Sequence, residues 1–386
     1  MKKPLNILLL VGTANDIFIY NMSKWLKKSM NINIDVFEFE PSSNQGYDNR
    51  HFDNLTSVIY KNPLMRVKGV RSLIKPYIGS KQLRRYLLNK HYDIIQCHWI
   101  VPAVVLTKNI KEHCSKLYVT FWGGELESLK LLYSHDYYLF KLKELLDSVD
   151  TIINSQLFLN RLNVFVPNLS VKLHNASLGS SSIEELYKLN DNETKEESKQ
   201  YWDIPLDKTT VLIGYSGKGL HNHIPIINEL KKNKEYKINF HLLAPMTRGA
   251  CKNYVSEVET TLKKSGFSYT LIKDRFLSDL EVARLRRSTD ITLQLSDFDG
   301  YSRSIVELLC AGSILIYGDW LNYKDRLNDD GFSAYSVSSI EEAVLVMEEV
   351  IRGSQINITN ENLYKGRKYL WSECIKDWVN IYSEND

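Results

Sequence analysis

The fold is constrained most by short apolar runs that alternate with helical stretches in two successive series along the chain. In the first series, the runs that indicate buried strands are 7–11, 34–39, 92–96, 117–121 and 151–154. In the second series they are 210–214, 240–243, 269–272, 291–295 and 314–317. Strands that alternate with helices form a parallel sheet covered by helices on both faces. The sequence therefore predicts an α/β protein with two doubly wound domains.

A polar, charge-dense segment at 188–197 separates the two series and interrupts their periodicity. We therefore predict an N-terminal domain over residues 1–187, a linker over 188–205 and a second domain over 206–362. The chain has 386 residues, which is enough for two domains that each bury a core. The aromatic-rich segment 363–386 is predicted to follow as a final helix.

The composition is that of a globular protein, with 44% hydrophobic and 25% charged residues. The five cysteines are scattered without the paired spacing of a zinc site, so we expect reduced thiols and no structural zinc. The apolar run at 7–11 is too short for a secretory signal, and we expect no membrane-spanning segment. These features predict a cytoplasmic protein.

The strongest functional signal is the segment 299–307, which reads DGYSRSIVE and joins a predicted strand to an apolar helix that ends at Gly312. It places the carboxylates of Asp299 and Glu307 eight positions apart across a turn that contains glycine. Free backbone amides and the helix dipole at such a helix start attract a diphosphate. Carboxylates nearby can accept hydrogen bonds from sugar hydroxyls. The alternative is that the acids only stabilise the helix start.

Written as DGYS…VELLCAG, this segment resembles the EGFG…LLEAxAxG signature of the retaining GT-B glycosyltransferases, above all glycosyltransferase family 4. The resemblance implies two Rossmann-like domains that face a cleft, with the segment 363–386 as a helix that returns to the N-terminal domain. It implies that Glu307 binds the ribose of a nucleotide sugar and that Asp299 contacts the donor sugar. The loop residues whose amides would hold the sugar and the diphosphate are Gly300, Tyr301 and Ser302.

Three of the departures from the family pattern concern the donor sugar. Asp299 is one methylene shorter than the usual Glu, and Ser302 replaces the second loop glycine. In the N-terminal half, VTFWGGE at 119–125 resembles the family's strand-end VTxHGxD/E, with Trp122 in place of the His that contacts the sugar. This change favours an altered, more apolar hexose pocket suited to a deoxy sugar. The alternative is a core tryptophan.

The loop that follows the predicted strand 210–214 reads GYSGKG and is a second candidate for phosphate binding. Backbone amides can cradle a phosphate, and a lysine can supply the counter-charge. The residues expected in these roles are Ser216, Gly217 and Lys218. Because Tyr215 occupies the position where the family carries an Arg, Arg248 and Arg303 are candidates for the missing positive charge. The alternative is that Lys218, Arg248 and Arg303 are ordinary exposed side chains.

The N-terminal half contributes a second group of candidates. From the resemblance, the residues expected to line its side of the cleft are Gly12, Thr13, Trp122 and Gly123. His98 follows a predicted strand, and we take it as a candidate catalytic residue that contacts the substrate. The alternative is a structural histidine.

The triplet Asp297-Phe298-Asp299 spells the DxD of metal-dependent glycosyltransferases. It overlaps the longer signature of a metal-independent fold, so we interpret it as a chance match. We therefore predict no metal and no cofactor beyond the nucleotide-diphosphate sugar that serves as co-substrate. The motifs GxSxG, HExxH and GxGxxG with a downstream acid, which mark other enzyme classes, do not occur.

Between Asp53 and Asp93 the chain contains no acidic residue. The basic residues in this window are Lys61, Arg66, Lys68, Arg71, Lys75, Lys81, Arg84, Arg85 and Lys90. Interleaved apolar residues predict amphipathic helices with a basic face, which favours contact with anionic lipid headgroups. The alternative is a solvated charged face. Nucleic acid is not expected as a partner, because no nucleic-acid-binding module is recognisable.

These features predict a hexosyltransferase-type enzyme that moves a sugar from a nucleotide-diphosphate donor to a glycan or polyprenyl-diphosphate-linked acceptor. The resemblance implies retention of configuration. It also implies bacterial surface polysaccharide synthesis, such as O-antigen or capsule, by a protein that is peripheral on the inner face of the cell membrane. Two alternatives stay open: a sugar-nucleotide 2-epimerase of the same fold, and a non-catalytic homologue that binds glycan or lipid.

Overall fold

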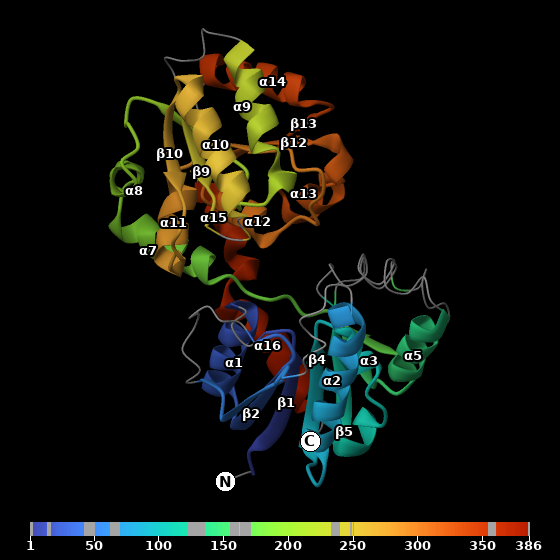
Figure 1. Ribbon diagram of the computed structural model, residues 1–386. Helices are drawn as coiled ribbons and strands as arrows, with labels where there is room; N and C mark the ends of the chain where they lie inside the picture. Colours follow the sequence, from blue (N-terminus) through green and yellow to red (C-terminus); the bar gives the residue numbers. More distant parts are fainter. Residues whose placement is uncertain are drawn as a thin grey trace. The chain divides into compact units, whose positions relative to one another are not determined.

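The computed structural model describes residues 3–13, 17–41, 51–61, 70–121, 136–154, 162, 171–232, 240–247, 249, 251–353 and 360–384. The chain forms two compact units (Figure 1). The first combines Met1–Gly179 with Trp371–Asp386, and the second is Ser180–Leu370. None of the helices in the described ranges combines the length and the hydropathy needed to span a bilayer.

The first unit contains, within its described residues, a parallel seven-stranded sheet of order β3-β2-β1-β4-β5-β6-β7. Its strands are β1 (Leu5–Val11), β2 (Ile32–Glu38), β3 (Asn54–Ser57), β4 (Tyr92–His98), β5 (Cys114–Thr120), β6 (Thr151–Ile153) and β7 (Lys172–His174). The interior strand β1 is apolar almost throughout because both faces of the sheet are covered.

Helices cover both faces of this sheet. They are α1 (Ile17–Ser29), α2 (Val70–Leu87), α3 (Pro102–Val105), η3 (Ile110–His113), α5 (Asp136–Asp147) and α16 (Trp371–Ser383). Ile7 and Leu9 of β1 belong to a core with α1 and α16, whereas Leu8 and Leu10 belong to a core with α2, α3 and α5. The alternation of side chains along the strand thus supplies both cores.

The C-terminal helix α16 packs beside α1, far from it in sequence (Figure 1). Trp371 and Trp378 are fully buried, and the Trp378 indole donates to the carbonyl of Ser177 at 3.0 Å. The Tyr382 hydroxyl donates to Oε1 of Gln96, whose Nε2 donates to Thr120 at 2.8 Å. The predicted return of the C-terminal helix to the N-terminal unit is confirmed.

The second unit contains, in its described part, a parallel six-stranded sheet of order β10-β9-β8-β11-β12-β13. The strands are β8 (Thr209–Ile213), β9 (Phe240–Pro245), β10 (Ser268–Ile272), β11 (Ile291–Gln294), β12 (Ile314–Gly318) and β13 (Tyr335–Val337). The helices are α7 (Ser181–Asn192), α8 (Lys195–Tyr201), η4 (Gly219–His221), α9 (His223–Lys232), α10 (Lys252–Ser265), α11 (Asp279–Arg287), α12 (Arg303–Cys310), η6 (Asp319–Leu321), α13 (Lys324–Asp330), α14 (Ile340–Gly353), α15 (Asn360–Lys365) and η7 (Gly366–Tyr369).

Two cores again sandwich the sheet. Val211 and Ile213 of β8 pack with residues of α9, α10 and α14, and Leu212 packs with residues of α7, α11 and α12. Ser278 and Glu281 form the capping box predicted for the start of α11, with both reciprocal hydrogen bonds present.

The structure differs from the predicted domain boundaries at both ends of the second unit. The segment 188–205, interpreted as a linker, lies largely in α7 and α8, and Leu189 and Trp202 pack into the core of the second unit. Its charges are divided between exposed positions and a buried cluster in which Lys195 and Lys199 pair with Asp290. At the other end, residues 363–370 belong to the second unit, so the returning helix begins at Trp371.

We predict that Tyr382→Phe lowers the free energy of unfolding of the first unit by about 1–3 kcal/mol, because it removes the hydroxyl that donates to the buried Gln96 carbonyl. Urea denaturation followed by tryptophan fluorescence measures this change. Tyr77→Phe is the matched control, since the Tyr77 side chain is exposed. Equal stabilities of the two variants would contradict the role given to Tyr382.

Candidate functional site

The candidate site of the second unit lies where the order of its strands reverses. The chain proceeds from β8 to β9 and β10 on one side and from β11 to β12 and β13 on the other, so the switch point falls between β8 and β11. Ligands of open α/β sheets bind outside the carboxyl ends of the strands at such a point. The glycine-rich loop at 214–219 and the signature segment 299–307 follow these two strands.

Asp299 joins three loops at this edge. The Tyr215 hydroxyl, after β8, donates to Oδ1, and the Tyr323 hydroxyl, after β12, donates to Oδ2. The backbone N–H of Ser302 also donates to Oδ2, at 3.0 Å. Burial, together with the negative charge of Asp299, raises the pKa of both tyrosines, so both hydroxyls remain protonated donors. Both carboxylate oxygens of Asp299 thus accept hydrogen bonds from the protein itself.

The turn after Asp299 leaves one side of the backbone open. Among the described atoms, none lies within 4 Å of the position that a Cβ on Gly300 would take. Tyr301 has a left-handed backbone with φ 63°, which is uncommon for a residue with a side chain. Its hydroxyl donates to Oδ2 of Asp330 at 3.0 Å. Ser302 then precedes the first turn of α12. A ligand can therefore approach the backbone at Gly300.

Glu307 lies in α12 with 7% of its surface exposed. Its Oε1 accepts from the Ser180 hydroxyl at 2.8 Å, and its Oε2 accepts from Nε of Arg286 at 3.3 Å. Arg286 is itself 5% exposed and comes from α11. A buried carboxylate requires such a partner, because an unpaired charge in the interior is strongly destabilising. The side chain is therefore fixed between α7 and α11.

Arg303, the candidate cation of the signature segment, contacts Tyr369. Its guanidinium stacks over the ring of Tyr369 at 4.1 Å from the ring centre. It begins α12 one helical turn before Glu307, so the two side chains share a face of the helix. The stacked guanidinium presents its face to the ring, so its in-plane N–H groups can still donate to a phosphate, and the phosphate role of Arg303 stays a prediction.

The glycine-rich loop is shaped by close packing. Gly214 has φ 65°, and a Cβ there would lie 2.8 Å from atoms of His221 and His223. Ser216 and Gly217 are buried, and Ser216 Oγ lies 2.8 Å from Nε2 of His221. Only glycine fits at position 214.

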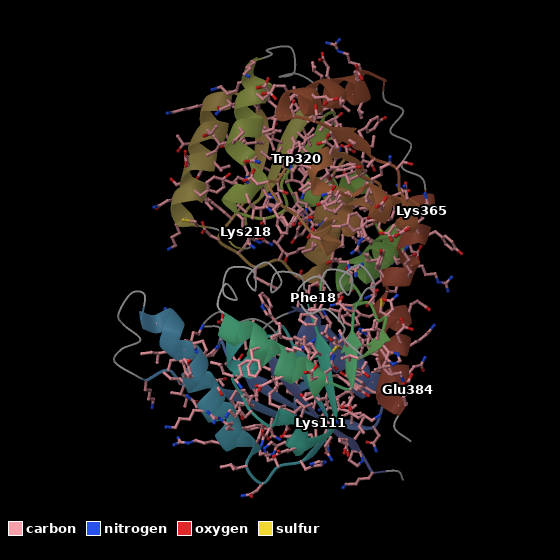
Figure 2. The ribbon with its side chains drawn as sticks, turned by 90° about the vertical axis from the view of Figure 1, so that its right-hand side faces the viewer. Phe18, Lys111, Lys218, Trp320, Lys365 and Glu384 are labelled. Carbon is pink, nitrogen blue, oxygen red and sulfur yellow. The ribbon has the colours of Figure 1, made fainter. Side chains whose placement is uncertain are left out.

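Lys218, in the loop after β8, is exposed, and its side chain lies beside Gly249 in the loop after β9. A Cβ on Gly249, which has φ 67°, would lie 2.9 Å from Cε of Lys218. Figure 2 labels Lys218 and Trp320 among the side chains of the second unit. Arg248, the other proposed base of this region, lies outside the described residues.

Two histidines beside the loop are neutral. Burial lowers the pKa of His221 to about 4 and that of His223 to about 3. His223 Nδ1 lies 3.2 Å from the Tyr254 hydroxyl. The sequence pattern also missed Tyr323, Ser180 and Arg286, because each contacts the signature from a segment outside the local motif.

In the first unit, His98 ends β4 with only 1% of its surface exposed and packs against Trp378, with ring centres 6.1 Å apart. Burial lowers its pKa to about 3. This burial favours the structural alternative given for His98, and a contact between His98 and a substrate stays a prediction. Gly12 and Thr13 follow β1, and no described atom lies within 4 Å of a Cβ on Gly12. Trp122 and Gly123 lie outside the described residues.

Within the described residues, no group of three His, Cys, Asp or Glu side chains is arranged to hold a metal ion. The two acids of the DxD triplet have different partners. Asp297 accepts from the Asn222 amide at 2.8 Å, whereas Asp299 accepts from the two tyrosines.

Comparison with known proteins identifies the fold. Sucrose-phosphate synthase from Thermosynechococcus elongatus matches with a TM-score of 0.73 over 98% of both chains at 11% identity. A glycosyltransferase from Rickettsia africae matches with a TM-score of 0.67 over 99% of this chain and 98% of the other, at 14% identity. Anabaena HepE in complex with UDP and glucose matches with a TM-score of 0.68 over 98% of this chain and 100% of the other, at 13% identity.

The chain has the GT-B fold. It consists of two Rossmann-like units and a C-terminal helix that returns to the first. No protein-family model and no curated protein sequence matches the chain. Because the structural matches are at low identity, they establish the architecture, and the chemistry must be argued from the residues.

The buried histidines predict that stability falls on acidification. His98 has a pKa of about 3 in the folded chain and an ordinary value of 6.5, so between these values the unfolded chain binds a proton that the folded chain does not. The free energy of unfolding should therefore fall by about 1.4 kcal/mol per pH unit for this residue as the pH drops below 6.5. Urea denaturation at several pH values should show that the free energy of unfolding of His98→Gln depends less steeply on pH. An unchanged pH dependence would contradict the burial of a neutral His98.

Proposed function

We propose that this GT-B chain is a glycosyltransferase that moves a sugar from a nucleotide-diphosphate donor to a glycan or lipid-linked acceptor. The observation that carries the proposal is the position of the signature segment 299–307. It begins beside the switch point of the second sheet, next to the glycine-rich loop with Lys218, where a doubly wound sheet binds its ligand.

Different residues at this edge are proposed to bind different parts of the donor. The open backbone at Gly300 and the loop amides near it approach the sugar and the diphosphate. Lys218 supplies positive charge from the neighbouring loop. Glu307 is proposed to accept from the ribose hydroxyls with its remaining lone pairs, while the Ser180 hydroxyl and Arg286 hold the carboxylate in place.

The chemistry asked of such a site is positioning and electrostatic stabilisation. Departure of the nucleoside diphosphate leaves positive charge on the sugar ring and negative charge on the leaving group. Fixed amides and Lys218 stabilise the leaving group without reorganising, and binding holds the acceptor hydroxyl near the reacting carbon. We propose retention of configuration from the resemblance of the signature, and we assign no residue as a covalent nucleophile.

The structural neighbours suggest the first donors to test. Anabaena HepE was determined with UDP and glucose, which makes UDP-sugars the starting point for this chain. Conversion of the donor to an isomer in the absence of acceptor would instead indicate the 2-epimerase alternative. If the purified protein neither binds nor alters any of the donors, the non-catalytic homologue is favoured.

The first unit supplies a candidate surface for the acceptor. On α2 and just beyond it, one helical face carries exposed side chains spaced three to four residues apart: Tyr77, Lys81, Arg84, Arg85 and Leu88. Tyr77 and Leu88 expose 57% and 63% of their surface, so the face combines positive charge with exposed apolar groups. This combination fits an anionic lipid surface, and we propose peripheral contact with a membrane that holds a polyprenyl-diphosphate-linked acceptor.

We predict that Glu307→Gln weakens binding of the correct nucleotide at least about tenfold, because a hydrogen bond to a charged acceptor contributes about 1.5–3 kcal/mol. Titration calorimetry measures the affinity, and thermal unfolding controls for the lost ion pair with Arg286. Glu348→Gln, on α14, is the matched control. Unchanged affinity would mean that Glu307 has only a structural role.

We predict that Lys218→Met weakens binding of the nucleoside diphosphate about tenfold or more and leaves binding of the corresponding nucleoside unchanged, because Lys218 is assigned to phosphate. Lys231→Met, near the end of α9, is the control cation and should change neither affinity. Equal losses for nucleoside and diphosphate in Lys218→Met would refute the assignment.

We predict that replacing Lys81, Arg84 and Arg85 with Ser reduces co-sedimentation with phosphatidylglycerol vesicles and leaves nucleotide affinity unchanged. The loss should be larger at low salt, where electrostatic attraction is weakly screened. If the unmodified protein does not sediment with the vesicles at low salt, the membrane proposal fails and a soluble acceptor is favoured.

A further inference from the structure

The chain passes between its two units twice, after Gly179 and after Leu370. These two passes run side by side. The backbone N–H of Ser180 donates to the carbonyl of Tyr369 at 2.8 Å, and a Cβ on Gly179 would lie 2.6 Å from the indole of Trp371. The residues at the crossing are therefore held together by main-chain contact and by close packing.

The side chain of Ser180 reaches one end of the signature segment. Its hydroxyl donates to Oε1 of Glu307 at 2.8 Å and accepts from the backbone N–H of Ile183 at 3.3 Å as the N-cap of α7. Ser180 and Glu307 are 4% and 7% exposed. One buried hydroxyl thus fixes both the start of α7 and the orientation of the Glu307 carboxylate.

The side chain of Tyr369 reaches the other end of the signature. Its hydroxyl donates to Oδ1 of Asp330 at 2.6 Å, and Oδ2 of the same carboxylate accepts from Tyr301 at 3.0 Å. Tyr301 is the residue with the left-handed backbone in the turn after Asp299. Lys368 pairs with Asp330 at 2.7 Å, and the guanidinium of Arg303 covers the ring of Tyr369.

We propose that Ser180 and Tyr369 are positioning residues of the donor site, each holding one end of the signature segment from the point where the chain crosses between units. The assignment rests on the proposed function, which makes Glu307 and the Tyr301 turn parts of that site. Neither residue is proposed to touch the donor. Ser180 acts through the Glu307 carboxylate, and Tyr369 acts through Asp330 on the Tyr301 turn.

The hydrogen bonds from Ser180 to Glu307 and from Tyr369 to Asp330 restrict the conformations of the signature segment before a ligand binds. A left-handed backbone at a residue with a side chain is maintained only where its surroundings hold it. The bond from Tyr301 to Asp330 does so, and Tyr369 fixes Asp330. Without Ser180, the Glu307 carboxylate retains Arg286 as its partner but loses the second contact that sets its rotation. When either hydrogen bond is lost, ligand binding must also order Glu307 or the Tyr301 turn, which is already ordered in the unmodified chain.

Ser180 and Tyr369 contact each other and also hold the donor site. Ligand binding at the site and the contact between Ser180 and Tyr369 therefore stabilise each other. A ligand that orders Glu307 and the Tyr301 turn also stabilises the contact between Ser180 and Tyr369. The amide of Ser180 should therefore exchange more slowly with deuterium when the site is occupied. Ligand binding also slows amides that exchange only through global unfolding, so the slowing at Ser180 should exceed that of a core amide such as Leu212.

The test uses the full chain and the member of the set UDP, GDP, dTDP and CDP that binds most tightly. Ser180→Ala and Tyr369→Phe should each weaken its binding by about threefold to tenfold, since each removes one hydrogen bond to a carboxylate. Ser180→Thr, which keeps the hydroxyl, should restore the affinity. Tyr187→Phe is the matched control, because the Tyr187 hydroxyl donates to the carbonyl of Leu363 at 2.8 Å within the same core.

Thermal unfolding separates positioning from stability: the Tyr369→Phe and Tyr187→Phe variants should lose similar stability, and only the first should lose affinity. Unchanged affinity in both Ser180→Ala and Tyr369→Phe, or nucleotide binding that leaves exchange at Ser180 unaltered, overturns the proposal while the proposed function stands. If the unmodified chain binds none of the four nucleotides, the proposed function fails and this assignment fails with it.

Discussion

The candidate site depends on the hydrogen bonds that the carboxylate of Asp299 accepts. It accepts from Tyr215 after β8, from Tyr323 after β12 and from the Ser302 amide at the start of α12. Three chain segments that leave the same edge of the sheet are thereby fixed to one charged group. Because both oxygens are occupied, the acid shapes the turn that opens at Gly300, and a contact to the donor sugar would have to be made in addition to these bonds.

Charge in this region is arranged so that little of it is buried without a partner. Glu307 faces Arg286, and burial keeps His221 and His223 neutral. Lys218 is the exposed cation of the glycine-rich loop. In the proposed function, this distribution leaves the backbone amides and Lys218 to attract a diphosphate. Tyr215 and Asp299 are coupled, since the tyrosine hydroxyl donates to the carboxylate.

The strands at the centres of both sheets could be predicted from sequence, because a parallel strand covered on both faces must be apolar, as in β1 and β8. The edge strands β3, β7 and β13 could not, since they are short and partly polar. The acids of the signature were found from their local spacing. Their partners were not, because Tyr215 lies 84 residues from Asp299 and Ser180 lies 127 residues from Glu307. Only the folded chain brings these groups together.

The central claim is that the GT-B scaffold of this chain transfers a sugar from a nucleotide donor. Phosphorus NMR of the purified protein incubated with UDP-, GDP- and dTDP-sugars tests it most directly, because cleavage of the donor gives a separate diphosphate signal. The account predicts slow release of one nucleoside diphosphate in water, faster release when the acceptor is supplied, and loss of both with Glu307→Gln. Donors that all remain intact, or that are isomerised without release of nucleotide, would contradict it.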